Sequence, residues 1–82
     1  MNQIIGRETT YNGASHPWMK GLKVRVIRVI RTDVASYEDD ADLARAGGLR
    51  ATDVVEVLPW NVKEGRFSWV SSDATPADLG LV

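Results

Sequence analysis

Four cations are spaced along one strand-like run of aliphatic residues, Leu22 to Arg31. They are Lys23, Arg25, Arg28 and Arg31. Cations two residues apart on a strand are separated by about 7 Å, which is close to the spacing of successive phosphates on one nucleic-acid strand. This spacing permits binding to a phosphate backbone. It equally permits cations that keep the outer face of a strand soluble or that pair with nearby acids.

The next thirteen residues, 32 to 44, contain five acids and no cation. The acids are Asp33, Glu38, Asp39, Asp40 and Asp42. They permit docking on the basic groove of a larger partner by imitating phosphates. The alternative is that they form the solvated start of a helix, where acids are favourable. Asp40 and Asp42 are not followed by the glycine and distal glutamate of a calcium loop, so no metal site is predicted.

The residue types that catalysis requires are sparse in this chain. The single histidine, His16, lies beside Ser15 in a proline-containing turn, without a nucleophile-elbow sequence or a second metal-binding residue. Gly47-Gly48 lacks the flanking pattern of a phosphate-binding loop. The absence of cysteine excludes a thiolate nucleophile, a disulfide framework and cysteine-containing zinc sites. We therefore expect no enzymatic activity and no cofactor.

Length and composition are those of one small folded domain. The chain has 82 residues, of which 44% are hydrophobic and 26% charged. It contains no apolar run of roughly eighteen residues and no recognisable export signal, so we expect a cytoplasmic protein that does not enter membranes. The pI of about 5.7 disfavours a dedicated nucleic-acid binder, because such domains are usually basic.

The basic run must be held by a strand that changes register. Leu22, Val24 and Val26 alternate with cations, but strict alternation beyond them would turn Arg28 into the core. A β-bulge at Val26-Ile27 returns the later aliphatics to the core and turns Arg28 outward beside Lys23 and Arg25. The alternative is a sharply bent strand that serves two sheets.

The acidic stretch predicts a short helix over 36 to 46. Ser36 is the expected cap, the acids fill the first turn, and Gly47-Gly48 ends the helix. Before the basic run, residues 1 to 21 are rich in turn-forming residues and are expected to form an N-terminal arm with at most one short strand.

The C-terminal third predicts a hairpin followed by short elements. A strand over 53 to 58 ends at Pro59, a turn follows at 63 to 65, and a second strand covers 66 to 71. Phe67 and Trp69 alternate on one side of that second strand, which favours a core position for Trp69. A helical turn within 72 to 78 and a last short strand over 79 to 82 complete the chain.

Two further tryptophans are candidates for an interface. Trp18 and Trp60 each adjoin a proline in an expected loop. A large exposed aromatic side chain in such a position often anchors a protein interface. The alternative is that both rings cover the ends of a small barrel.

The order of the later segments resembles a known fold family. Thr52-Asp53-Val54-Val55-Glu56-Val57-Leu58 is followed by Gly65-Arg66-Phe67-Ser68-Trp69-Val70, then by Ser72-Asp73 and by Asp78-Leu79-Gly80-Leu81-Val82. Over residues 20 to 82 this order is similar to a Src-homology-3-like small β-barrel. The resemblance implies a mainly β domain over 22 to 82 with a helical insertion at about 36 to 46. A small α+β sheet with the helix packed on one face is the alternative.

The resemblance does not extend to the peptide site of the signalling members, because their Ala-Leu-Tyr-Asp-Tyr-type motif is absent. We expect a non-enzymatic protein that binds a protein or ribonucleoprotein partner stoichiometrically. In its size, lack of motif and acidic patch it resembles inhibitors of the anti-CRISPR type from phages and plasmids. The alternative is a small barrel that binds nucleic acid directly through the basic strand. An exposed strand edge would also permit a dimer.

Overall fold

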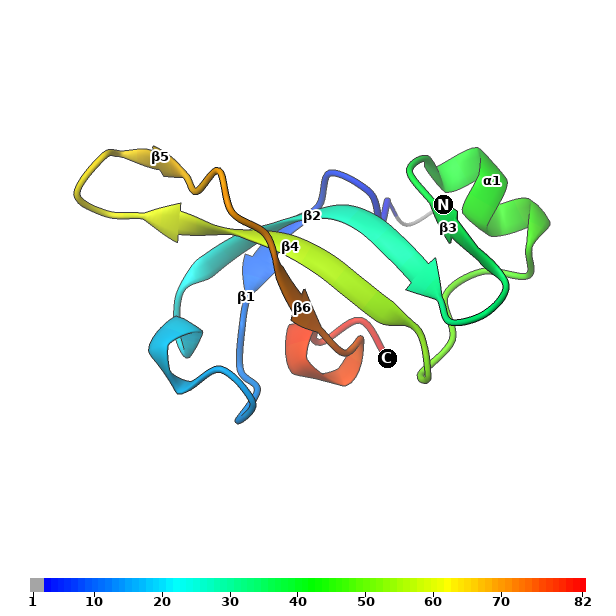
Figure 1. The fold of residues 1–82 in the computed structure, drawn as a ribbon, viewed down its shortest axis with the longest axis horizontal. Helices are drawn as coiled ribbons and strands as arrows, with labels where there is room; N and C mark the ends of the chain where they lie inside the picture. The colour runs from blue at the N-terminus through cyan, green and yellow to red at the C-terminus, as the bar shows by residue number, and fades with distance from the viewer. Residues whose placement is uncertain (1–2) are drawn as a thin grey trace.

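Two long antiparallel strands, β2 (Lys23–Arg31) and β4 (Val54–Asn61), form the middle of the sheet (Figure 1). The computed structural model describes residues 3–82, and within them six strands form one antiparallel sheet. The outer edge of β2 pairs with β1 (Glu8–Thr10) near its start and with β3 (Ala35–Tyr37) near its end. The fold is therefore mainly β, as the sequence predicted.

The outer edge of β4 is also divided between two strands. β6 (Ser72–Ala74) pairs with the first half of β4, and β5 (Arg66–Phe67) pairs with its end. The sheet thus has two halves that share the β2–β4 ribbon. One half adds β1 and β5, and the other adds β3 and β6 (Figure 1).

β2 contains the predicted bulge. Val26 pairs with Val57 and Arg28 pairs with Glu56, so Ile27 is the extra residue in the ladder. Val29 is buried after the bulge, and Arg28 lies on the same outer face as Glu56. An extra residue raises the local twist of a strand, which suits a strand shared between two half-sheets.

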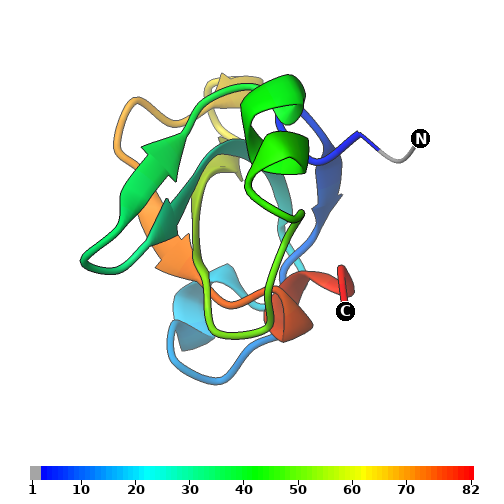
Figure 2. The same ribbon diagram turned by 90° about the vertical axis from the view of Figure 1, so that its right-hand side faces the viewer.

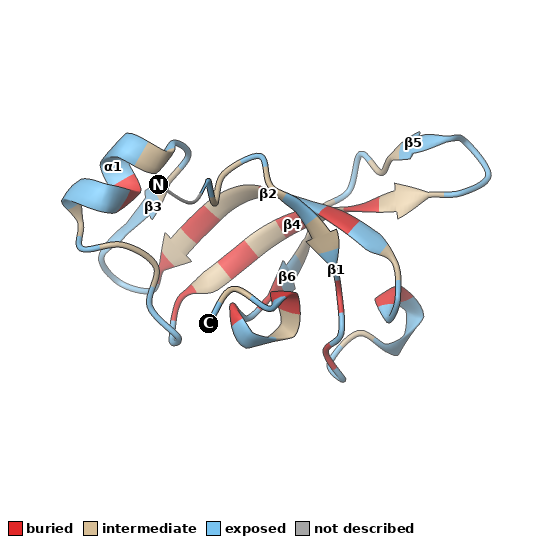
Figure 3. Cartoon of the chain, turned by 180° about the vertical axis from the view of Figure 1, so that it is seen from behind, coloured by how far each residue is buried: buried red, intermediate tan, exposed pale blue. Residues whose placement is uncertain are grey.

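The core is built mainly from the inner face of the ribbon. Buried and less buried positions alternate along β2 and β4 (Figure 3). The main buried cluster comprises Tyr11, Met19, Val24, Val26, Val55, Val57, Ala74 and Leu79. Tyr11 and Met19 come from the segment expected as an arm, so its described part, residues 3–21, contributes to the same core. Met19 belongs to a short 3₁₀ helix, η1 (Pro17–Met19).

The sheet curls but does not close (Figure 2). A second 3₁₀ helix, η2 (Ala77–Leu79), follows β6 and is hydrogen-bonded to the segment that contains β1. Thr9 donates to the carbonyl of Leu79 at 3.2 Å, and the Asn12 N–H donates to the carbonyl of Asp78 at 2.9 Å. These single bonds take the place of a strand ladder, so the closed barrel expected from the sequence is not confirmed.

The helix is shorter than predicted. α1 spans Asp40–Arg45 and is capped by Asp39, whereas Ser36 belongs to β3. The prediction of Ser36 as the cap is wrong, because residues 35–37 pair with the end of β2 instead. The expected stop is correct, since Gly47 and Gly48 follow with φ values of 96° and 83°. α1 lies beyond β3 at one end of the sheet, rather than across one of its faces (Figure 1).

β4 does not end at Pro59, contrary to the prediction. Pro59 is buried inside β4 opposite Val24, and its carbonyl accepts a hydrogen bond from the Ser68 N–H at 2.7 Å. The backbone nitrogen and carbonyl of Pro59 thus face the outer edge of β4, where the pairing partner changes from β6 to β5. The missing N–H costs no bond to β2 there.

The chain after the hairpin also departs from the prediction. The strand expected over 66 to 71 is only two residues long, and β6 is a separate strand. The last strand expected over 79 to 82 is absent from the described residues. Gly80 adopts a left-handed conformation, and the Leu81 N–H donates to the Pro76 carbonyl at 2.9 Å, so the backbone turns back locally.

Candidate functional site

The exposed cations of β2 are paired with acids on the outer face of the sheet. The Glu8 carboxylate forms ion pairs with Lys23 Nζ at 3.7 Å and with the Arg25 guanidinium at 3.0 Å. Arg28 contacts Glu38 at 2.6 Å and Glu56 at 3.4 Å. Hydrogen bonding from Arg25 lowers the pKa of Glu8, which keeps this acid ionised. The structure therefore brings three of the four predicted cations onto one face and neutralises much of their charge.

Arg31, the fourth cation of the candidate phosphate-binding set, does not share that face. Its side chain points inward and the residue is only 7% exposed. The bulge explains this orientation, because side chains alternate along a strand and the shift that turns Arg28 outward turns Arg31 inward. Arg31 is therefore a structural residue.

A buried ion pair holds Arg31 in place. Its guanidinium donates to both carboxylate oxygens of Asp53, at 2.9 and 2.8 Å, and Asp53 is 3% exposed. It also donates to the carbonyls of Ala46 and Gly48, at 3.0 and 2.9 Å. These bonds from Arg31 lower the pKa of Asp53, although burial opposes the change. The pair thereby joins the end of β2 to the end of α1 and to the start of β4.

Most of the predicted acidic patch is used inside the fold. Asp39 caps α1 by accepting from the Asp42 N–H at 2.8 Å, and this bond lowers the pKa of Asp39. Asp40 accepts from the N–H groups of Ile4 and Ile5, at 2.9 and 3.1 Å.

The other three acids differ in their surroundings. Glu38 pairs with Arg28, and Asp42 pairs with Arg45 on α1. Asp33 is exposed in the turn between β2 and β3, with a φ of 63°. Four of the five predicted acids therefore have structural partners.

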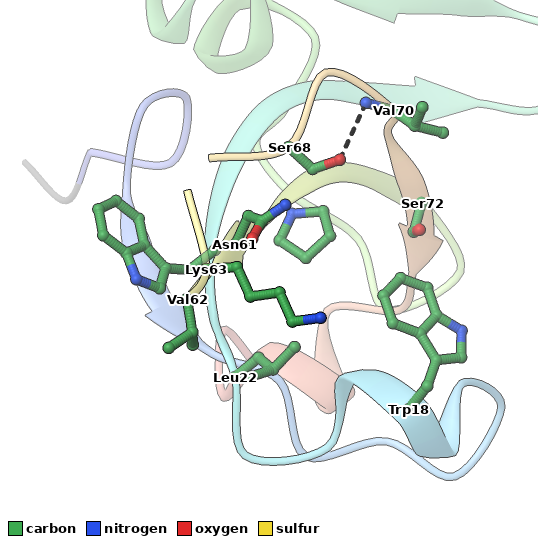
Figure 4. A pocket seen from close by; sticks show the side chains of 10 residues that line it. Trp18, Leu22, Asn61, Val62, Lys63, Ser68, Val70 and Ser72 are labelled. Atoms are coloured by element: carbon green, nitrogen blue, oxygen red, sulfur yellow. Dashed lines mark hydrogen bonds between the residues drawn. The ribbon is translucent and has the colours of Figure 1, made fainter. Parts of the chain in front are cut away.

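The two predicted interface tryptophans line one pocket. This pocket has a volume of about 340 Å³ and lies between η1 and the β4–β5 hairpin. Its apolar lining consists of Trp18, Leu22, Pro59, Trp60, Val62 and Val70. Trp18 is 61% exposed and stands across the pocket from Val62 (Figure 4). The structure thus brings Trp18 and Trp60 together although 41 residues separate them in the sequence.

The polar lining of the pocket includes one cation and no acid. It consists of Asn61, Lys63, Ser68 and Ser72. The side chain of Lys63 extends between Trp18 and Val62 (Figure 4). Within residues 3–82 Lys63 forms no ion pair. An anionic group that enters the pocket would therefore find an unneutralised ammonium.

Cations also lie over the aromatic rings near the pocket. Lys23 Nζ is 5.0 Å from the centroid of the Trp60 ring, and the Arg25 guanidinium is 4.4 Å from that of Phe67. The Arg66 guanidinium lies 5.4 Å from the Trp69 ring. At such distances the cation is attracted to the ring face.

Trp69 is 82% exposed, so the prediction that it lies in the core is wrong. The alternation with Phe67 ends because β5 stops at that residue. Val62, Lys63 and Val70 were missed as pocket residues. For Val62 the sequence signal was an apolar residue between the two expected strands, where apolar side chains are rarely needed for the core, whereas Val70 belonged to the strand expected over 66 to 71.

His16 lies between two aromatic rings, with centroids 6.1 Å from Tyr11 and 6.2 Å from Trp18. Together with Ser15, Asp73 and Asp78 it borders a smaller cavity of about 210 Å³. Asp78 is engaged in the local fold, since its carboxylate accepts from the Thr75 N–H at 3.1 Å. No group of three or more potential metal ligands occurs among residues 3–82.

Charge is distributed unevenly between the two ends of the molecule. We define the hairpin end as residues 8–25 and 58–70, and the helix end as residues 28–56 (Figure 1). The hairpin end contains five cations and two acids, and Asp73 and Asp78, which border a cavity with Ser15 and His16, add two more acids there; the helix end contains four cations and seven acids. The pocket therefore lies at the positive end.

A scan of family models, a search of curated proteins and a search of solved structures each gave no match to this chain. No helix in the described residues has the length and apolar character needed to cross a membrane.

Proposed function

We propose that this protein is a non-catalytic binding module that docks stoichiometrically on a protein or ribonucleoprotein through the pocket at the hairpin end. The observation that carries the proposal is the concentration of exposed apolar side chains there. Trp18, Val62 and Val70 line the pocket, Trp69 precedes Val70 in the chain, and each of the four is more than half exposed. Contiguous exposed apolar surface in a small domain is typical of an interaction site.

Direct binding of nucleic acid through the basic strand is the weaker candidate. Glu8, Glu38 and Glu56 already pair with the exposed cations of β2. Arg31 is buried. A phosphate backbone would have to displace these acids, so the strand offers less net attraction than its sequence indicates.

We further propose that the open sheet is a variant of the Src-homology-3-like small barrel. Support comes from the order of elements: a long bulged strand, a β4–β5 hairpin, a short β6 and one 3₁₀ turn before the C-terminus. In this proposal η2 and its hydrogen bonds to the β1 segment replace the strand that closes the barrel in the family. Fold membership says nothing about the ligand.

An inhibitor of the anti-CRISPR type remains one instance of the proposed function. That expectation was based partly on the acidic patch, whose members now have mostly structural roles. If the protein is such an inhibitor, we expect it to engage its target through the hairpin end.

Affinity capture with matched variants tests the docking face. Val70→Asp places a charge at the pocket, whereas Val34→Asp places one on an equally exposed valine at the helix end. Lysate of the organism that encodes the protein is passed over immobilised wild type and both variants, with and without nuclease. We expect a nuclease-resistant protein partner that is retained by wild type and Val34→Asp and lost by Val70→Asp.

Two results would contradict the proposal. Equal retention of the partner by wild type and Val70→Asp would move the interface away from the pocket. Loss of all bound material after nuclease treatment would favour direct nucleic-acid binding. In that case Arg25→Glu with Arg28→Glu should abolish the binding, and its salt dependence should be steep.

A further inference from the structure

We infer that the pocket at the hairpin end recognises an acidic peptide segment of the partner, with one large apolar side chain packed against Trp18 and a neighbouring carboxylate on Lys63. This inference deepens the proposed function and rests on it. It assigns the chemical class of the ligand, which the proposed function leaves open.

The shape and lining of the pocket define the anchor of the ligand. The pocket's volume of about 340 Å³ suits one large apolar or aromatic side chain with adjoining backbone, and six of its ten lining residues are apolar. Trp18 closes one side of this space and Val62 the other (Figure 4). Burying such an anchor side chain stabilises a complex by removing apolar surface from water.

The charge of the pocket defines the flanks of the ligand. Lys63 is the only charged residue of the lining, and it has no ion pair within residues 3–82. With Asp73 and Asp78 counted, the hairpin end has one more cation than acids, whereas the helix end has three more acids than cations. A segment with carboxylates beside its anchor therefore matches the pocket both locally and in the longer-range field that steers association.

The aromatic rings favour a peptide over single-stranded nucleic acid. A platform for successive bases requires ring faces that are free for stacking. Lys23 lies over one face of Trp60, Arg25 over one face of Phe67, and Arg66 over one face of Trp69. Cations of the same chain thus compete with bases for one face of each of these three rings, whereas the single pocket still admits one side chain.

Titrations with defined probes test this inference. A short peptide with a central tryptophan flanked by aspartates is compared with the same peptide carrying asparagines in place of the aspartates, and with oligothymidine. Binding is followed by fluorescence anisotropy and by the amide NMR spectrum of the protein. We expect the aspartate peptide to bind about tenfold or more tightly than the asparagine peptide, a difference of about 1.4 kcal/mol. Its largest shifts should fall on Val62, Lys63 and Val70.

Two charge reversals of similar exposure separate the pocket from the general field. Lys63→Glu should remove the preference for aspartate, whereas Lys20→Glu, outside the pocket lining, should change the affinity by no more than about threefold. Trp18→Ala should weaken both peptides. Because Lys20, Lys63 and Trp18 are exposed, all three variants are expected to fold.

Several outcomes would overturn the inference. They are equal binding of the two peptides, tighter binding of oligothymidine, and persistence of the aspartate preference in Lys63→Glu. A fourth is a concentration-dependent shift of the pocket amides without ligand, which would identify a second copy of the chain as the occupant. Equal peptide binding that still requires Trp18 would reject only the ligand chemistry. Absence of any shift at the pocket, together with capture insensitive to Val70→Asp, would reject the proposed function as well.

Discussion

At the helix end, a buried ion pair connects separate segments of the backbone, whereas at the hairpin end the ion pairs are exposed and cations also lie over aromatic rings. Arg31 and Asp53 join β2, α1 and β4 through a buried pair with additional backbone contacts. Lys23 and Arg66, by contrast, rest on Trp60 and Trp69 near the molecular surface. The same residue types thus serve the fold at one end and leave a surface available at the other.

This difference separates stability from binding. A buried charged group loses its hydration, so removing its partner strongly destabilises the folded state. An exposed aromatic ring contributes little to folding, but it can bury a large area against a partner. Substitutions of the buried pair should therefore change stability, and substitutions of the exposed pocket side chains should change affinity.

The largest effect is expected from breaking the buried pair. Asp53→Ala leaves a guanidinium buried without its counter-ion and should lower the free energy of unfolding by about 3 to 5 kcal/mol. That loss is a large part of the roughly 4 to 12 kcal/mol expected for a chain of this length. Chemical denaturation monitored by tryptophan fluorescence measures it. A loss no larger than that of Glu64→Ala, which removes an exposed acid at the hairpin end, would contradict the contrast between the two ends.

An acid-induced loss of stability should follow from the lowered pKa of Asp53. Because this pKa is lower in the folded state, the stabilisation is fully present above the ordinary aspartate value of roughly 4 and declines as the pH falls through the folded value. Denaturation curves recorded from neutral pH downward measure this decline. Carboxyl NMR of the wild type should show Asp53 titrating below the ordinary value, and titration at or above that value would refute the prediction.

The smallest stability effect is expected at the pocket. Trp18→Ala and Val70→Asp alter exposed side chains and should change the free energy of unfolding by no more than about 0.5 kcal/mol. Thermal unfolding of the two variants beside the wild type provides the measurement. A larger loss would mean that the pocket residues support the fold, and the capture experiment would then need to be repeated at a temperature where the variants remain folded.

Local sequence patterns predicted the parts of the fold that depend on neighbouring residues. The broken alternation around Val26 and Ile27 predicted the bulge, and the β4–β5 hairpin followed from alternating segments around a Gly65 turn. The glycine pair predicted the end of α1. These features arise from side-chain direction and backbone conformation within a few residues.

Features that depend on distant segments were predicted poorly. Residues 35–37 pair with β2 as a strand, so the helix is shorter than expected. Pro59 remains inside a strand because the pairing partner along the outer edge of β4 changes there. The exposure of Trp69 was missed for a related reason. The length of β5 depends on how far its partner strand continues to pair with it, and alternation alone does not contain that information.

The sequence by itself determined the mainly β class and the bulge, but it placed Trp60 in a loop, whereas this residue lies half-buried within β4. Tertiary structure alone decided which acids pair with which cations, because an ion pair depends on which distant strands become neighbours. Through pairing across the sheet, Glu8 and Glu56 came to neutralise the cations of β2, and the register of the bulge turned Arg31 toward Asp53. Folding also placed Trp18 opposite the hairpin, and the pocket exists only in that arrangement.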